Sequence, residues 1–487
     1  MFFIDHLPIV VQAILIPAYF ITILVVVILI MLENRSPLKT ITWILVLMLL
    51  PGVGIVFYIF FGQNLRKEKI IARKGLKNDE LLVSMAHAQI RRMDEGSLIE
   101  NAHINNKRHI IQLLLNNSNS VVTIGNKINL LNNGSETFSA ILTALEQAQC
   151  FIHLEYYIFA NDNIGGQIVA ILKQKASQGV EVRMIVDDVG SWELKQDFFD
   201  DLLSSNIQIE SFLQVRFPKF TSRVNYRNHR KILVVDGLVG FIGGINVADR
   251  YISGDESYGI WRDTHLMVEG DAVNTLQMVF LADWYFVRQV ELAEEKYFPP
   301  KIPHGDSMVQ ITSSGPDTDW PAIMMGIFHA IASAQKYVYI ATPYFMPGET
   351  VLMALKSAAL GGIDVRILIP QKNDAWFTRL CSYSYVKELL EANIKVYFYE
   401  KGFLHSKTLV VDDVVSTIGS ANIDFRSFEQ NFEINAFIFD EKIAVEMKLT
   451  FLNDLDDSIL IQYDQWKQRP LKQKMQESFA RLFSPLL

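Results

Sequence analysis

Cysteine is scarce in this chain of 487 residues, and an excess of positive charge is absent. The two cysteines, Cys150 and Cys381, lie far apart in the sequence and fit neither a disulfide framework nor a zinc-finger spacing. We expect both to be buried, reduced thiols. The formal net charge of −8 argues against a general nucleic-acid-binding protein, because such proteins usually carry a basic excess. A local basic pocket for one phosphate remains compatible with this charge.

The N-terminus lacks the features of a cleaved signal peptide. Its start carries Asp5 and no early lysine or arginine, and the first apolar run, residues 7–32, is longer than a signal-peptide core. A polar break at residues 33–39 separates it from a second apolar run at residues 40–61. Each run is long enough for a membrane-spanning helix, which needs about 20 residues. Residues 1–62 are therefore predicted to form a two-helix transmembrane hairpin.

Basic residues predict the orientation of this hairpin. The turn between the two runs holds only Arg35 and Lys39, whereas a larger basic group follows the second run. Because the more basic flank of a membrane span stays in the cytoplasm, we expect a multi-pass membrane protein whose body and termini are cytoplasmic. The residues of the larger group are Arg66, Lys67, Lys69, Arg73, Lys74 and Lys77.

The rest of the chain reads as a connecting segment followed by a duplication. Residues 63–120 are polar and helix-leaning, and we interpret them as the connection. Strand-like residues 152–159 and 179–186 flank a helical stretch, which is the order of a parallel strand–helix–strand unit. The same order recurs in the second half and ends in strand-like residues 362–369. The sequence thus predicts an α/β fold with two duplicated lobes, at residues 121–295 and 296–487.

One pattern, H-x-K-x4-D, occurs once in each lobe. Each copy continues into a turn of small residues that ends in asparagine, although the first turn has Gly244 where the second has Ser420. Chance does not readily produce two copies with matched continuations, so they predict one composite active site built from both halves. The residues are His229, Lys231, Asp236 and Asn246 in the first copy, and His405, Lys407, Asp412 and Asn422 in the second.

These residue types suit phosphodiester transfer. Alternation along a strand puts the histidine and the lysine of each copy on one face. One imidazole can attack phosphorus and form a phosphohistidine, while the other carries the proton for the departing and arriving oxygens. The lysines would stabilise the anionic transition state, and the asparagines can donate further hydrogen bonds. The chemistry needs no metal or other cofactor, and Asp236 and Asp412 are expected to brace the motif loops.

The paired patterns resemble the HKD motifs of the phospholipase D superfamily. Together with the N-terminal runs, they make the chain similar over nearly its whole length to the two-motif, membrane-anchored cardiolipin synthases of bacteria. The resemblance implies two lobes packed as a pseudo-dimer about a pseudo-twofold axis, with both motifs at one interface. It also implies an acidic partner for each histidine, and here Glu433 fits His405 and Asp263 fits His229. It leans to His229 as the attacking residue without deciding the matter.

The activity implied by the resemblance is cardiolipin synthesis in the bacterial plasma (inner) membrane. A phosphatidyl group would pass from one phosphatidylglycerol to another, and glycerol would leave. Three alternatives stay open: a membrane-bound phospholipase D that yields phosphatidic acid, a non-catalytic scaffold for anionic lipid, and a membrane-bound nuclease, which the acidic net charge disfavours. Membrane phospholipids are the expected partners and nucleic acid is not. The sequence leaves open the oligomeric state and the use of phosphatidylethanolamine as a donor.

Two further features have two interpretations each. Glu155, on an apolar strand, is either a support for catalysis or a structural carboxylate with its partners satisfied. Residues 466–487 combine basic residues with apolar ones at helical spacing. They predict a basic amphipathic helix that lies either on an anionic membrane or against the body of the protein.

Overall fold

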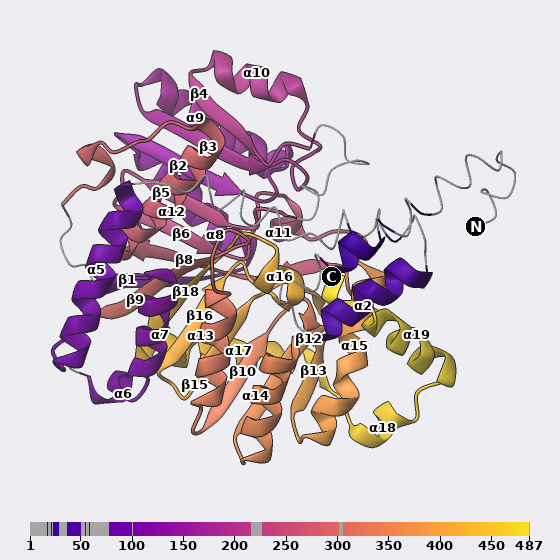
Figure 1. Ribbon diagram of the computed structural model, residues 1–487. Helices are drawn as coiled ribbons and strands as arrows, with labels where there is room; N and C mark the ends of the chain where they lie inside the picture. The colour runs from indigo at the N-terminus through magenta and orange to yellow at the C-terminus, as the bar shows by residue number, and fades with distance from the viewer. Residues whose placement is uncertain are drawn as a thin grey trace, which may run out of the picture. The chain divides into compact units, whose positions relative to one another are not determined.

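The computed structural model describes residues 77–99, 101–215, 226–300 and 305–486, together with short stretches among the first 58 residues. These residues divide into two units: the described stretches among the first 58 residues belong to a small N-terminal unit, and those from Lys77 onward belong to a large unit. The large unit holds both predicted lobes (Figure 1).

In the N-terminal unit, the helix α2 (Pro37–Leu49) covers the start of the second apolar run. The rings of Trp43 and Tyr58 meet edge to face with their centroids 5.4 Å apart. Most of the first apolar run lies outside the described residues, and so do parts of the second. Within the described stretches, no helix has both the length and the apolar character needed to cross a membrane.

One continuous sheet of 15 strands runs through the described part of the large unit. Its middle is the antiparallel pair β1 and β9, one strand from each half of the chain. From that pair outward, the first half contributes β1 (Val122–Asn132), β8 (Thr264–Glu269), β6 (Val239–Gly243), β5 (Lys231–Val235), β2 (Phe151–Tyr156), β3 (Glu181–Asp187) and β4 (Ile207–Phe212). The second half contributes β9 (Ser307–Ser314), β18 (Glu433–Phe439), β16 (Val415–Gly419), β15 (Thr408–Val411), β10 (Tyr337–Ala341), β12 (Asp364–Pro370), β13 (Lys395–Tyr399) and β19 (Ser458–Leu460).

The two halves repeat the same strand order, apart from the additional edge strand β19. In each half, three outer strands run parallel and are joined by helices, because a parallel connection needs a crossover segment. The crossover helices are α9 (Asn163–Ser177) and α10 (Gln196–Ser204) in the first half, and α14 (Glu349–Leu360) and α15 (Trp376–Glu391) in the second. The predicted α/β fold with duplicated lobes is confirmed.

The hydrophobic core explains why the lobes form one compact unit. Each lobe has a core of its own on one side of the sheet. A third core takes residues from both lobes, and α12 (Ala272–Arg288) and α17 (Glu441–Asp456) contribute to it. Fully buried Leu276 of α12 and Ile434 of β18 both belong to this shared core. The lobes therefore meet through a continuous sheet and a common apolar layer.

The described part of the segment interpreted as a connection is mostly helical, with α5 (Lys77–Asp94), α6 (Ala102–Asn105) and α7 (Arg108–Ser118). It does more than connect, because Ile111 and Leu114 of α7 are buried in the core of the second lobe. That core packs them with residues of α13 (Ala322–Ala332). The expectation for the cysteines is half right: Cys381 is buried in the same core, whereas Cys150 is exposed just before β2.

Candidate active site

The two motif histidines lie at corresponding edges of the duplicated sheet. His229 lies two residues before Lys231, the first residue of β5. His405 lies two residues before Lys407, which directly precedes β15. The register pairs Lys231 with Tyr156, the last residue of β2, and Thr408 with Ala341, the last residue of β10. Both motifs therefore lie at the carboxyl ends of the parallel strands. We call this edge the histidine edge.

Short backbone ladders tie each motif to the opposite lobe. β14 (Gly402–Leu404) pairs in parallel with β7 (Ile260–Arg262), and the His405 amide donates to the Arg262 carbonyl at 2.7 Å. On the other side, the His229 amide donates to the carbonyl of Phe432 at 2.9 Å. Since Asp263 follows Arg262 and Glu433 follows Phe432, each ladder delivers an acidic residue to the histidine of the other lobe.

The acidic partners are therefore exchanged relative to the sequence prediction. Nδ1 of His229 lies 3.1 Å from Oε1 of Glu433, and Nδ1 of His405 lies 2.7 Å from Oδ2 of Asp263. The predicted pairs, His229 with Asp263 and His405 with Glu433, are wrong. The physical reason is the interlocking of the lobes, which the order of residues along one chain does not reveal. Both carboxylates are fully buried, so each histidine is held by a partner shielded from water.

His405 is held as a neutral imidazole. A carboxylate only accepts hydrogen bonds, so the short contact to Asp263 places a proton on Nδ1 and leaves Nε2 unprotonated. Burial, reinforced by the positive charge of Lys407, lowers the pKa of His405 to about 3. Burial opposes ionisation of Asp263, yet the charge of Lys407 and the hydrogen bond from His405 hold the pKa of this carboxyl below its usual range.

The two motif lysines are buried between these histidines and acids. Lys231 Nζ donates to the His229 carbonyl at 2.6 Å, and Lys407 Nζ donates to the His405 carbonyl and lies 3.0 Å from Nδ1 of that ring. Burial, together with mutual repulsion, lowers the pKa of Lys231 to about 7, and burial lowers that of Lys407 to about 8. Among the described residues neither of these ammonium groups forms a close ion pair with a carboxylate, so the two together make a favourable place for a phosphate.

The two asparagines that end the motif turns are held in different ways. Asn246 donates from Nδ2 to the Tyr251 hydroxyl at 2.8 Å and accepts from the Ile158 amide at 3.1 Å. The Tyr251 hydroxyl in turn lies 3.5 Å from Nδ1 of His405. Asn422 is buried, and its backbone amide donates to Ser427 Oγ at 3.2 Å. Asn246 thus supports a tyrosine beside the second histidine, which the sequence prediction did not anticipate.

The motif aspartates do not reach the site. Asp236 accepts from the amides of Cys150 and Phe151 at 2.7 and 2.8 Å, at the start of β2. Asp412 likewise accepts from the Lys336 amide at 2.7 Å, and it forms a buried ion pair with Lys107 at 2.7 Å. A strand rises about 3.3 Å per residue, so five residues of β5 separate Asp236 from Lys231 by roughly 16 Å. Both aspartates therefore brace the start of a neighbouring strand, which agrees with the bracing role expected for them, and they lie away from the histidines.

The structure adds two residues beside His229 that the sequence reasoning missed as site residues. Asn431 Nδ2 lies 3.3 Å from Nδ1 of His229 and donates to Oε1 of Glu433 at the same distance. The ring of Tyr157 lies over the imidazole of His229, with 4.1 Å between centroids. Asn431 stands two residues before Glu433, so its position in the sequence was the available signal. Tyr157 directly follows β2 and belongs to a group of aromatic residues for which the sequence favours core packing over a lipid channel.

The glycine at position 244, where the second turn has Ser420, has a steric cause. Ser420 Oγ donates to Oε2 of Glu433 in the second half. A Cβ at Gly244 would lie 2.3 Å from Oδ1 of Asp263, so a serine does not fit in the first half. Aspartate is one methylene shorter than glutamate, and its carboxylate therefore lies closer to its own backbone. The first half therefore combines Asp263 with Gly244, whereas the second half combines Glu433 with Ser420.

Glu155 belongs to a buried network that positions the first motif. It accepts from Nδ2 of Asn228, the residue before His229, and the Asn228 amide donates to Asp187 at 2.8 Å. Burial and the nearby Asp283 raise the pKa of Glu155 well above its usual range. Glu155 is thus a buried carboxyl that supports the backbone before His229 and makes no contact with the histidine itself.

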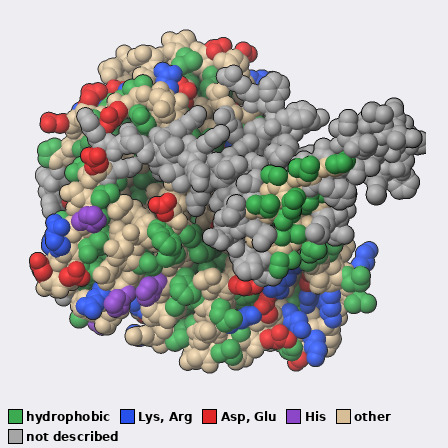
Figure 2. All heavy atoms as spheres, in the orientation of Figure 1, with side chains coloured by type: hydrophobic (Ala, Val, Ile, Leu, Met, Phe, Trp, Pro, Cys, Tyr) green, Lys and Arg blue, Asp and Glu red, His purple; other side chains and the backbone are tan. Residues whose placement is uncertain are grey.

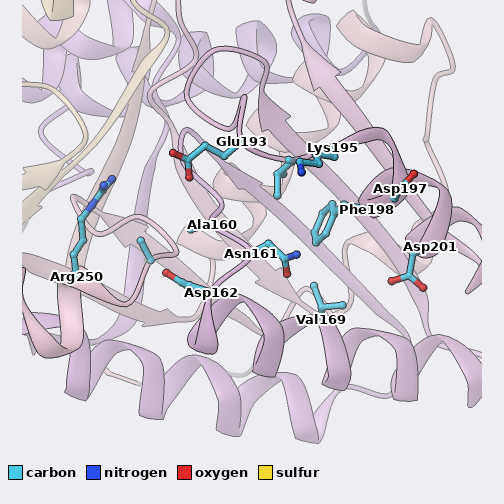
Figure 3. A pocket seen from close by; sticks show the side chains of 12 residues that line it. Ala160, Asn161, Asp162, Val169, Glu193, Lys195, Asp197, Phe198, Asp201 and Arg250 are labelled. Carbon is cyan, nitrogen blue, oxygen red and sulfur yellow. The ribbon is translucent and has the colours of Figure 1, made fainter.

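A cavity of about 790 Å³ opens in the first lobe beside this site (Figure 3). Charged side chains line it around Phe198, among them Asp162, Glu193 and Arg250. The Arg250 guanidinium lies 4.9 Å from the centroid of the Trp261 ring, which is itself 5.3 Å from the His405 ring. Across the described residues, no group of three or more His, Cys, Asp or Glu side chains could hold a metal ion.

The duplicated lobes and the paired histidine–lysine motifs at one interface define a phospholipase D-like protein. The fold is similar to that of phosphatidylserine synthase from Haemophilus influenzae Rd KW20, with a TM-score of 0.60 at 15% identity over 78% of this chain and 99% of that one. The sequence model described as "Cardiolipin synthase, PLD-like domain" matches residues 141–284 and 327–455. A model described as "Phospholipase_D-nuclease N-terminal" matches residues 20–63.

Curated relatives narrow this class to one family. A cardiolipin synthase of Geobacillus sp. (strain WCH70) is 42% identical over 458 residues, which cover 94% of this chain and 90% of the relative. A cardiolipin synthase of Halalkalibacterium halodurans is 42% identical over 469 residues, covering 96% and 92%. The chain belongs to the cardiolipin synthase family of phospholipase D-like phosphatidyltransferases, which confirms the family predicted from the paired motifs.

Proposed function

We propose that this chain makes cardiolipin from two molecules of phosphatidylglycerol. One histidine attacks the phosphorus of the first lipid, a P–O bond breaks, and glycerol leaves with a proton from the other histidine. That second histidine then takes the proton from a glycerol hydroxyl of the second lipid. The resulting oxygen attacks the phosphohistidine, which releases the first histidine and forms cardiolipin. One phosphodiester replaces another, so the exchange balances without a nucleotide.

The observation that carries this proposal is the crossed pairing of the histidines with buried acids. Each half of the site needs both lobes, and the two halves together present two oriented imidazoles and two buried lysines. Two imidazoles allow one group to attack while the other transfers protons. His405 already has the unprotonated Nε2 that an attacking imidazole requires. The lysines gain a counter-charge when the phosphate binds, so substrate binding also holds them protonated.

We also propose that residues 1–62 form a transmembrane hairpin in the bacterial plasma membrane, with the body in the cytoplasm. The two long apolar runs support it, and so does the basic group that follows the second run. The match of residues 20–63 to an N-terminal family model is consistent with a separate N-terminal module. Such an anchor would hold the site beside membrane phospholipids at high local concentration.

Product analysis tests the reaction. The full chain is reconstituted in vesicles of phosphatidylglycerol without nucleotide, and lipid and glycerol are measured by mass spectrometry. We expect cardiolipin and glycerol in equal amounts, and no product from the His229→Ala or His405→Ala variant. Phosphatidic acid in place of cardiolipin would mean that water is the acceptor and the chain is a hydrolase. Absence of any turnover by the parent chain would favour the scaffold alternative.

A further inference from the structure

The C-terminal helix α19 (Leu471–Arg481) has two unlike faces. Its inner face packs on α15, with Ala480 fully buried and Glu477 in an ion pair with Arg469 at 2.5 Å. Arg481 forms a second ion pair, to Glu388 of α15. The sequence left two interpretations open for this segment, and the contacts of the inner face agree with packing against the body of the protein.

The outer face of α19 is apolar and open to solvent. Leu471 and Leu482 are exposed to 72% and 74%, and Met475 and Phe479 lie between them at the spacing of one helix face. Lys467 and Lys472 are exposed beside this stripe. Figure 2 shows lysine and arginine side chains gathered over α18 (Tyr463–Lys467) and α19, next to hydrophobic ones. An apolar stripe with a basic border is the pattern of a helix at a membrane surface.

A chain of aromatic rings continues this stripe to the histidine edge. Phe479 contacts Phe483, Phe483 contacts Phe377 and Phe377 contacts Trp376, with centroids 5.3, 5.6 and 5.4 Å apart. Trp376 is 67% exposed and begins α15, in the connection that follows β12. Because β12 runs parallel to β10, its carboxyl end lies at the histidine edge. The apolar surface therefore extends from α19 to the edge where the motifs lie.

The first lobe places a tryptophan in the corresponding connection. Trp192 follows β3, which runs parallel to β2 and ends at the histidine edge as β12 does. It is 76% exposed. Tryptophan prefers the boundary between lipid headgroups and water, since its large ring is apolar and its N–H still finds a polar partner. Both lobes thus expose this residue type beside the site.

We propose that Leu471, Met475, Phe479, Leu482, Phe483 and Trp376 form a docking face that lies in the headgroup layer of an anionic bilayer. The proposal rests on the proposed function, in which both substrates are anionic lipids of that layer. Docking turns the histidine edge toward the lipid headgroups, so that a phosphodiester reaches the two lysines without leaving the membrane. Charge favours this occupant, because Lys467 and Lys472 at the border of the face would meet lipid phosphates.

A fluorescent label tests the contact without requiring catalysis. In full chain carrying Cys150→Ser, the variant Leu482→Cys is labelled with a nitrobenzoxadiazole dye and reconstituted in phosphatidylglycerol vesicles. Leu360→Cys is the matched control, because Leu360 is 66% exposed at the end of α14 that leads into the opposite edge of the sheet. We expect blue-shifted emission and quenching by nitroxide lipids at position 482 only. Equal, water-like emission at both positions would overturn the proposal.

Activity gives the second test. Leu471→Gln combined with Leu482→Gln should lower turnover of vesicle phosphatidylglycerol roughly tenfold, and leave turnover of dissolved, monomeric short-chain phosphatidylglycerol within about twofold. Leu360→Gln should change neither rate. An equal loss of turnover on both substrates would show that the face has a structural role. No loss on either substrate would show that the face has no role in activity. Both results contradict docking. A label that enters the lipid in a chain that makes no cardiolipin would refute the proposed reaction and leave docking intact.

Discussion

At the scale of single residues, the site is a set of buried charges held by hydrogen bonds. Asp263 and Glu433 are fully buried and each orients a histidine, whereas Asp236, which belongs to the motif itself, holds the start of a strand. An acidic residue orients a histidine here when it contacts the other lobe, and its closeness to the motif in the sequence does not decide this role. The roles of Asp236 and Asp263 can therefore be distinguished by experiment.

Asp263→Asn should lower kcat by about 100-fold, because the amide can no longer hold the Nδ1 proton of His405 in place and stabilise the imidazolium. Asp236→Asn is the matched control, with the same chemical change at a carboxylate remote from the reaction. It should keep kcat within about threefold and instead lower the free energy of unfolding by about 1–3 kcal/mol, since hydrogen bonds to a charged group are weakened. Rates in lipid vesicles and thermal unfolding measure the two effects. A larger loss of kcat in the Asp236 variant would refute the assignment.

The lysines predict an alkaline limit to activity. With pKa values of about 7 and 8, Lys231 and Lys407 lose their charge as the pH rises through this range, and a neutral lysine no longer stabilises the phosphate. We expect kcat/KM to fall above about pH 7 to 8 and kcat to fall at higher pH, because the bound phosphate raises both pKa values.

Lys231→Arg supplies the control for this profile. Arginine does not lose its proton in this range, so the alkaline fall that is due to Lys231 should disappear, even though the variant is slower because guanidinium geometry differs. The same alkaline limb in the arginine variant would assign it to another group.

At the scale of elements, two short ladders decide the geometry of the site. β14 and β7 have three residues each, yet they fix the His405 backbone against the residue before Asp263. The close approach depends on Gly402, where a Cβ would lie 2.0 Å from the Ile260 carbonyl oxygen. An isolated ladder of this size is weak, so it persists because the lobes that carry it are already joined.

Gly402→Ala should therefore push the two strands apart and lower kcat by about 100-fold, since a shift of about 1 Å at a catalytic group costs that much. Gly348→Ala is the matched control: its Cβ would come no closer than 3.7 Å to Phe425, an ordinary contact. We expect the control to keep nearly full activity, and steady-state rates on phosphatidylglycerol vesicles compare the two. Full activity of Gly402→Ala would show that the ladder does not position His405.

At the scale of the whole molecule, the lobes are joined by a shared core and a continuous sheet. The central β1–β9 pair and the core around Leu276 and Ile434 join the described residues of both lobes into one unit. A composite site needs this union, because each histidine takes its partner from the other lobe. The proposed membrane hairpin adds a second level of organisation, and its orientation can be measured.

Thiol labelling in intact cells tests that orientation. We expect Ser36→Cys, in the polar break between the apolar runs, to react with a membrane-impermeant maleimide from outside the cell. Cys150 is exposed in the body and should react only after the cells are lysed; buried Cys381 should stay unreactive in both. Labelling of Cys150 in intact cells would place the body outside, and unreactive Ser36→Cys would contradict a hairpin.

The sequence by itself determined the duplication, the α/β class, and the paired histidines and lysines proposed as the site. Those features leave local or repeated patterns: alternation along strands, crossover helices, and one motif written twice. Only the tertiary structure decided which acid meets which histidine, because the crossed pairs Glu433 with His229 and Asp263 with His405 depend on how the lobes interlock. It also showed which strands Asp236 and Asp412 brace, and it brought Asn431 and Tyr251 beside the histidines. A motif fixes residue types along a chain, whereas a side chain's partner is set by packing between segments far apart in sequence.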